Sequence, residues 1–139
     1  MIALDTLTVG DVVAERTVAV SRDSLVRYAG ASGDFNPIHY RDDVAASVGL
    51  PGVLAHGMLT MGTAVQPVMD WVGGAHHVLD YQVRFTRPVV VDPHEGAELE
   101  ITAKVGSLDA AAGTARIDLT VRFEGGTVLG KAQVVVRLG

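Results

Sequence analysis

The stretch VAASVGLPGVLAHGMLTMGTAVQPVM, residues 44–69, contains no aspartate, glutamate, lysine or arginine. An uncharged run of 26 residues first suggests a membrane span, which needs about 20 mostly apolar residues in one continuous helix. The Gly-Leu-Pro-Gly sequence at 49–52 breaks any such helix near its start. We therefore expect the run to be buried against protein rather than lipid.

Within this run, the sequence from His56 to about Trp71 predicts the longest helix of the chain. The segment is apolar nearly all round, which is typical of a helix surrounded by protein. Pro67 implies that the helix either kinks or ends near Gln66, because proline lacks the N–H that helical hydrogen bonding requires.

The length and composition of the chain limit what it can do. Its 139 residues correspond to one domain, residues 1–139. Lys and Arg number 11 and Asp and Glu 16, and the resulting net charge of -5 excludes a broad electrostatic nucleic-acid binder. The absence of cysteine excludes disulfides, thiolate catalysis and thiolate metal sites. The opening residues MIALD lack the basic segment of an export signal, so we expect a cytoplasmic protein without membrane partners.

The second half of the chain predicts strands, because apolar and polar residues alternate there. A Gly-Gly hairpin at 124–126 and a short turn at 108–113 join successive strands and favour antiparallel pairing. The expected strands cover residues 80–86, 98–105, 114–123 and 127–138.

The first half predicts one strand and two further helices. Residues 12–20 are typical of an opening strand, and Ser21 is a candidate cap for a helix over about 22–31. Residues 42–48 predict a short helix with acids in its first turn. A buried helix with an antiparallel sheet curled around it is an α+β architecture. Because such a sheet has edge strands and one exposed face, we expect dimerisation.

The densest group of candidate catalytic residues is Gly33-Asp34-Phe35-Asn36-Pro37-Ile38-His39. Pro37 restricts Asn36 to extended backbone and suits the first position of a new helix, which places His39 in its opening turn. Asp34 and His39 can then face one small volume, hold a water and exchange protons near neutral pH. The alternative is purely structural, since Asn-Pro is a common turn and a nearby histidine is often a satisfied polar group.

A second candidate is Ala55-His56-Gly57-Met58, at the start of the long helix. A helix N-terminus presents unpaired N–H groups and a partial positive charge, which suits a developing oxyanion. The structural alternative is that Gly57 only permits close packing of helix and sheet.

Other chemistry-bearing residues form weaker patterns. The adjacent pair His76-His77 is predicted at a strand start, where the two side chains point to opposite faces and chelate poorly. A metal site built from Asp34, His39, Asp42 and Asp43 is conceivable, but no strict ligand spacing supports it. The apolar side chains at Met58, Met61, Met69 and Trp71 are interpreted as core, or as walls of an acyl pocket.

Together, the segment from Tyr28 to His39 and the segment Pro51-Gly52-Val53-Leu54-Ala55-His56-Gly57-Met58 resemble the MaoC-like hot-dog family. That family includes (R)-specific enoyl-CoA hydratases and (3R)-hydroxyacyl-ACP dehydratases, and its signature Asp-x-Asn-Pro-x-His is complete at 34–39. The sequence is most similar to the HadB-type catalytic subunit of fatty acid synthase II dehydratases. The resemblance implies a hot-dog fold, in which a curved antiparallel sheet wraps a long central helix.

The resemblance also implies the roles of individual residues. Asp34 and His39 would be the catalytic pair, and Asn36 would fix the Asp side chain or the water. Gly57 would offer its backbone N–H to the thioester carbonyl, and the neighbouring His56 and Met58 are candidate substrate-binding residues. Such an enzyme hydrates trans-2-enoyl thioesters or dehydrates (3R)-hydroxyacyl thioesters, with no metal or organic cofactor.

Several alternatives stay open at this level. A hot-dog thioesterase usually carries its carboxylate on the central helix, and residues 44–69 contain none. The chain could be a homodimer, the catalytic subunit of a heterodimer with a second hot-dog subunit, or a non-catalytic acyl binder. The substrate carrier could be CoA or acyl carrier protein, whose phosphates or acids could meet Arg84, Arg87 and Lys131.

Overall fold

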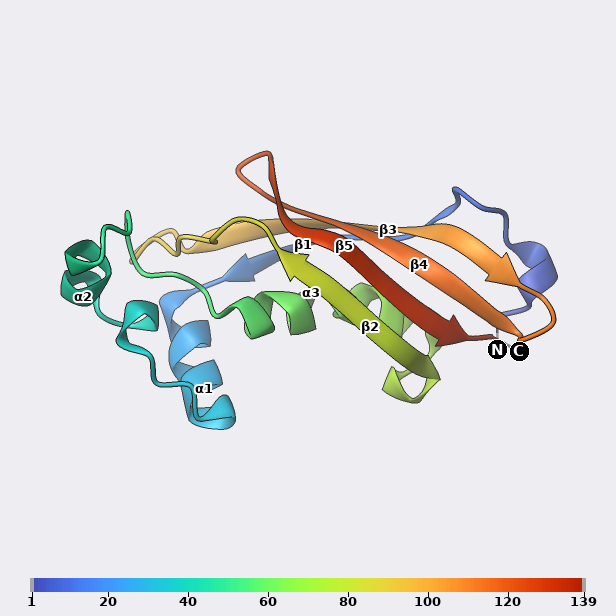
Figure 1. The fold of residues 1–139 in the computed structure, drawn as a ribbon, viewed down its shortest axis with the longest axis horizontal. Coiled ribbons are helices and arrows are strands. Elements are labelled where there is room, and N and C mark those ends of the chain that lie inside the picture. The colour runs from blue at the N-terminus through green and yellow to red at the C-terminus, as the bar shows by residue number, and fades with distance from the viewer. Residues whose placement is uncertain (1, 139) are drawn as a thin grey trace.

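In the computed structural model, which describes residues 2–138, a five-stranded antiparallel sheet covers one long helix (Figure 1). The strands lie in the order β1-β3-β4-β5-β2, and every neighbouring pair is antiparallel. They are β1 (Val12–Val20), β2 (Val78–Phe85), β3 (Ala97–Asp109), β4 (Thr114–Phe123) and β5 (Gly126–Arg137). The predicted α+β class and hot-dog fold are confirmed.

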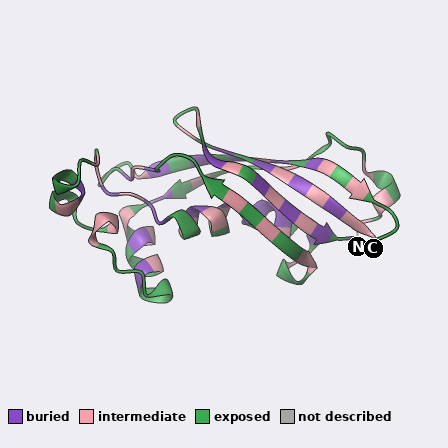
Figure 2. Cartoon of the chain, viewed as in Figure 1, coloured by how far each residue is buried: buried purple, intermediate pink, exposed green. Residues whose placement is uncertain are grey.

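Burial alternates along the central strands, as the sequence predicts (Figure 2). On β3, Leu99, Ile101 and Ala103 are buried, whereas Glu98 and Glu100 point to the opposite face and are exposed. The buried face of the sheet packs against the helix and forms the core with it. The edge strand β2 is less covered than the central strands, and most of its residues are exposed or half-buried.

The long helix α3 (Gly57–Val72) lies under the sheet (Figure 1). It continues through Pro67 and ends at Gly73, whose left-handed backbone (φ 94°) glycine adopts at low cost. An end near Gln66, one of the two predicted outcomes, is therefore wrong. The helix tolerates the lack of an N–H at Pro67 because its buried face, including Ala64 and Val68, packs in the core.

One face of α3 is not covered by the chain. Met58, Gly62, Gln66 and Asp70 are spaced four residues apart, share this face and are exposed. The expectation of a helix surrounded by protein is thus wrong for the described part of the chain, and so is a core position for Met58, which is 57% exposed.

The segment before α3 extends away from the sheet at one end of the molecule (Figure 1). It contains α1 (Arg22–Ser32), a 3-10 turn η2 (Pro37–His39) and α2 (Asp42–Ser47). Ser21 and Ser24 form a capping box at the start of α1. The Arg22 guanidinium pairs with Asp42 at 2.8 Å and donates to the Val91 carbonyl at 2.5 Å. This side chain therefore ties α1 and α2 to the segment that precedes β3.

Two further 3-10 turns complete the fold, η1 (Leu4–Thr6) and η3 (Ala75–His77). His76 and His77 lie in η3 and not at a strand start, so the prediction that their rings point to opposite faces is wrong. Their ring centroids are 4.1 Å apart, so the two rings lie next to each other. None of the described helices combines the length and apolarity needed to cross a bilayer.

Candidate active site

The loop after α1 fixes the Asp34 carboxylate through local hydrogen bonds. Gly33 ends α1 in the left-handed region (φ 76°), which turns the chain toward Asp34. The Asp34 N–H donates to the Ser32 hydroxyl at 3.1 Å, and Asp34 Oδ1 accepts the Asn36 N–H at 3.2 Å. The short Gly-Asp-x-Asn sequence thus orients the carboxylate through hydrogen bonds between near neighbours in the chain.

Asn36 and Pro37 then start the turn that carries His39. The Asn36 side-chain oxygen accepts the Ile38 N–H at 3.2 Å, so this side chain caps η2. Pro37 is the first residue of η2, and His39 lies in that single turn, as predicted. Asn36 therefore contacts Asp34 through its backbone N–H, while its side chain supports the turn of His39.

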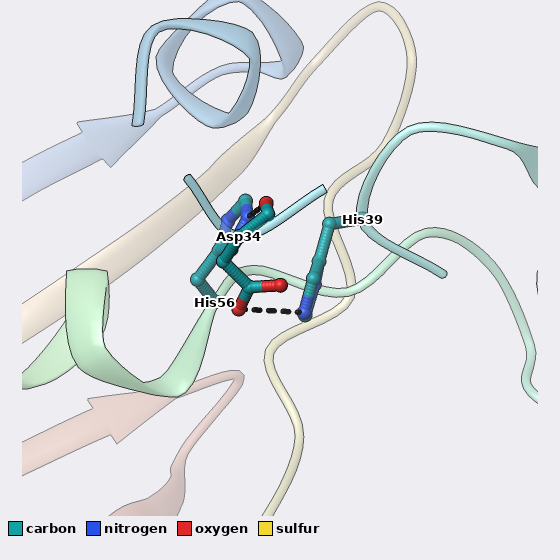
Figure 3. A group of neighbouring side chains, drawn as sticks. All are labelled: Asp34, His39 and His56. Carbon is teal, nitrogen blue, oxygen red and sulfur yellow. Dashed lines mark hydrogen bonds and ion pairs between the residues drawn. The ribbon is translucent and has the colours of Figure 1, made fainter. Parts of the chain in front are cut away.

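The imidazole of His39 is held in one orientation. Its Nδ1 lies 2.7 Å from the Leu54 carbonyl, which can only accept, so Nδ1 carries the proton. In the neutral ring, Nε2 is then an unprotonated acceptor. It faces Asp34 Oδ2 at 4.0 Å (Figure 3). The His39 side chain is 11% exposed and that of Asp34 51%.

The separation between His39 Nε2 and Asp34 Oδ2 is too long for a direct hydrogen bond. The distance is close to the separation of two acceptors that are bridged by one water. That separation is about 4.4 Å when each hydrogen bond is about 2.8 Å long. Each acceptor could take one of the two water protons. The pair can therefore hold and polarise a single water.

A third side chain, His56, belongs to this cluster (Figure 3). It is the residue before α3, 1% exposed, and its ring stacks on His39 with centroids 3.9 Å apart and planes 23° apart. Its Nε2 donates to the Asp34 backbone carbonyl at 3.1 Å. The other nitrogen, Nδ1, is buried and has no hydrogen-bond partner within residues 2–138. An unpaired buried acceptor costs about 1–3 kcal/mol of stability.

Burial holds the pKa of His56 below its ordinary value, because the charged ring loses its hydration. The neighbouring His39 ring acts in the same direction, whereas the hydrogen bond to the Asp34 carbonyl partly opposes the shift. His56 is therefore neutral near pH 7, with its single proton on Nε2.

The three side chains also form the one group of potential metal ligands found in the described part of the chain, with ligand atoms within 4.8 Å of one another. The stacking of His39 on His56 opposes joint coordination. Two nearly parallel rings cannot both direct an in-plane lone pair at one ion about 2.0–2.1 Å away. His56 Nε2 is also occupied by the Asp34 carbonyl. Asp42 and Asp43, the other residues of the conceivable metal site, instead pair with Arg22 and Arg41.

Gly57 lies at a cavity of about 340 Å³ beside His39. It is the first residue of α3, where backbone N–H groups have no partner inside the helix. A Cβ at Gly57 would come within 3.1 Å of the Phe85 ring, so glycine lets this ring approach the backbone closely. The cavity is lined by His39, Leu54, Ala55, Gly57, Thr60, Phe85, Thr86, Arg87, Pro88, Val89, Val128 and Leu129.

The structure separates the sequence-predicted site residues into two groups. His39 and Gly57 line the cavity, whereas Asp34, Asn36, the buried His56 and the exposed Met58 do not. Asp34 and His56 lie against His39 beside the cavity. Of the three basic candidates for carrier binding, Arg87 lines the cavity, while Arg84 and Lys131 are exposed elsewhere on the sheet.

Sequence reasoning missed most of the lining residues, among them Thr60 and Phe85. Thr60 lies one turn after Gly57 on the same side of α3, a spacing that could have identified it. Phe85 ends β2, and only the packing of β2 beside α3 brings it to Gly57.

A family model described as "MaoC like domain" matches residues 6–122. Among curated proteins, the chain is 37% identical over 70 residues to 3-hydroxyacyl-thioester dehydratase X of Mycobacterium tuberculosis, covering 50% of this chain and 24% of the relative. It is 34% identical over 85 residues to a mitochondrial 3-hydroxyacyl-[acyl-carrier-protein] dehydratase of Arabidopsis thaliana, covering 61% of this chain and 50% of the relative. The chain thus spans half or less of the length of these relatives.

Solved structures share the fold over nearly the whole chain. A MaoC-like dehydratase superimposes with a TM-score of 0.95 at 39% identity, covering 99% of this chain and 42% of that one. The (R)-hydratase from A. caviae involved in PHA biosynthesis superimposes with a TM-score of 0.78 at 25% identity, covering 96% of this chain and 98% of that one.

The low pKa of His56 predicts how stability responds to acid. Protonation favours the unfolded chain, whose histidines titrate near 6.5, so the free energy of unfolding should fall as the pH drops below about 6.5. The fall due to His56 ends once the pH passes the lower folded pKa. Chemical denaturation between pH 8 and 5 measures it.

The variant His56→Gln should flatten this dependence, because glutamine does not titrate. The matched control His94→Gln, at an exposed turn, should keep the wild-type slope. Equal slopes for His56→Gln and the wild type would contradict the assignment.

Proposed function

This chain belongs to the MaoC-like domain family, and we propose that it is a hydro-lyase acting on acyl thioesters. It would add water to trans-2-enoyl thioesters and remove water from (3R)-hydroxyacyl thioesters. The observation that carries this proposal is the 4.0 Å gap between His39 Nε2 and Asp34 Oδ2, next to the cavity at the start of α3. The names of the dehydratase and hydratase relatives support the same reaction class.

In the hydration direction, the water between Asp34 and His39 attacks C3 of the enoyl thioester. One proton passes from the water to the pair, and the π electrons move toward the thioester carbonyl. The enolate oxygen formed in this way is stabilised by the Gly57 N–H and the positive end of α3. The pair then returns a proton to C2, so the pair ends in its starting state. Dehydration follows the same steps in reverse.

The cavity lining suits an acyl thioester. Val89, Val128 and Leu129 offer apolar surface for the acyl chain, and Phe85 lies over the Gly57 backbone. The Arg87 guanidinium at the same cavity could meet the phosphate of a phosphopantetheine arm. That arm is shared by CoA and acyl carrier protein, so both carriers fit this proposal.

A second hot-dog unit is the proposed partner. The exposed face of α3 and the uncovered edge of β2 leave apolar side chains at Met58, Leu79 and Phe85 open to solvent. A second copy of this chain would cover them in a homodimer. A different hot-dog chain would cover them if this chain is the catalytic subunit of a HadB-type heterodimer.

A thioesterase is less well supported. In α3 the sole acid is Asp70, which lies in the last turn and pairs with Arg16 at 2.9 Å. It is far along the helix from Gly57, so α3 offers no carboxylate at the cavity.

The catalytic pair predicts the outcome of two substitutions. Asp34→Asn and His39→Ala should each lower kcat for hydration of a 2-enoyl-CoA by about 100-fold or more, because each removes a general acid–base group. Loss of absorbance at the enone band measures the rate. The controls Asp23→Asn and His94→Ala, both at exposed positions, should stay within about 2-fold of the wild type. Full activity of both site variants, or release of free CoA thiol without hydration, would overturn the assignment.

The Gly57 N–H predicts a contrast between two variants. Gly57→Ala adds a Cβ but keeps the N–H, whereas Gly57→Pro adds the ring and removes the N–H. Proline suits the first helical position, and His56 already has the backbone (ψ 129°) that a residue before proline adopts. Gly57→Pro should therefore fold and lose about 100-fold more kcat than Gly57→Ala. Similar kcat values for the two variants would exclude the N–H from the reaction.

The uncovered surfaces predict the oligomeric state. Light scattering of the purified chain should give a dimer, and Leu79→Asp with Phe85→Asp should shift it toward monomer because charges oppose apolar contact. A monomeric wild type that becomes active when a second hot-dog chain is added would favour the heterodimer.

A further inference from the structure

We propose that His56 is a positioning residue that sets the distance between Asp34 and His39. This inference rests on the proposed function, because it concerns how the same pair is held. Among the described residues, His56 is the side chain that contacts both members of the pair. It donates a hydrogen bond to the Asp34 backbone carbonyl and stacks on the His39 ring.

The two contacts act on different parts of the pair. The hydrogen bond from Nε2, at 3.1 Å, anchors the loop that carries the Asp34 carboxylate. The stacked ring, with its centroid 3.9 Å from that of His39, limits how far the His39 ring can swing about its hydrogen bond to Leu54. Since neither the loop nor η2 is part of the sheet, these contacts link both to the start of α3.

Two further side chains contact His56, one at its ring and one at its backbone carbonyl. Tyr28 of α1 contacts its ring edge-on, with centroids 4.8 Å apart. The Thr60 hydroxyl donates to the His56 carbonyl at 3.4 Å, one turn into α3. A ring packed in this way can position the neighbouring Asp34 loop and the His39 ring.

The unpaired Nδ1 argues that this histidine is more than a space-filling residue. A phenylalanine would fill a similar volume and stack on His39 without burying an unpaired acceptor. Burying this acceptor costs the folded chain stability that a phenylalanine at the same position would not lose. The contact that phenylalanine cannot make is the hydrogen bond to the Asp34 carbonyl.

Two variants separate the contacts. His56→Phe keeps a stacked ring and loses the hydrogen bond. His56→Gln loses the ring, while its side-chain amide can still donate to the Asp34 carbonyl. The matched control is His77→Phe, in the other close histidine pair, which lies in η3 away from the cavity.

For His56→Phe we expect a Tm equal to or above that of the wild type, a kcat that is 10- to 100-fold lower, and a KM within about 3-fold. His56→Gln should fall between His56→Phe and the wild type in kcat. A residue that only fills space would give the opposite pattern, with His56→Phe fully active. His77→Phe should leave kcat unchanged. A kcat for His56→Phe within 2-fold of the wild type overturns the inference.

A readout that needs no substrate distinguishes failure of this inference from failure of the proposed function. Hydrogen–deuterium exchange of residues 33–40, followed by mass spectrometry, should be at least 10-fold faster in His56→Phe and close to wild type in His56→Gln. If the wild type does not hydrate enoyl-CoA, the proposed function fails, and the exchange rates alone decide whether His56 holds the loop. Equal exchange in His56→Phe and the wild type overturns the inference.

Discussion

The packing of α3 against the sheet is the constraint on which the rest of the structure depends. The core lies between the apolar faces of these two elements, and the uncharged sequence of residues 44–69 allows the helix to be placed there without burying a charge. Once the helix is fixed, its first residue, Gly57, is fixed beside β2 and the segment that precedes β3. The positive end of the helix dipole then has one defined location, and the loop that carries Asp34 and His39 lies beside it.

The geometry of the candidate site is assembled from two levels of interaction. Local turns orient each group, through the Asn36 N–H to Asp34 and the Asn36 side chain that caps the turn of His39. Long-range contacts then set the distance between them, because the Leu54 carbonyl holds the His39 ring. The local level is encoded in seven consecutive residues, whereas the long-range level depends on how the chain returns to the start of α3.

This division explains what could be predicted from sequence. The strands were predictable because alternation directly reflects which face packs on the helix, and Asp34, Asn36 and His39 were predictable because they lie within one turn motif. The course of α3 through Pro67 could not be predicted from sequence, since core packing outweighs the loss of one helical hydrogen bond. The burial of His56 and the approach of Phe85 to Gly57 could not be predicted either, because both depend on which distant segments pack together.

The charge distribution around the cavity bears on the kind of chemistry it can support. In the cluster of Asp34, His39 and His56, the one carboxylate is half exposed, and the buried histidine is neutral because burial lowers its pKa. The stacked rings cannot converge on an ion, so the cluster is poorly suited to activating water through a metal. What remains is a pair of acceptors, spaced for one water, next to a helix N-terminus that presents N–H groups. In the proposed reaction, this pair would move the proton and the helix N-terminus would stabilise the enolate.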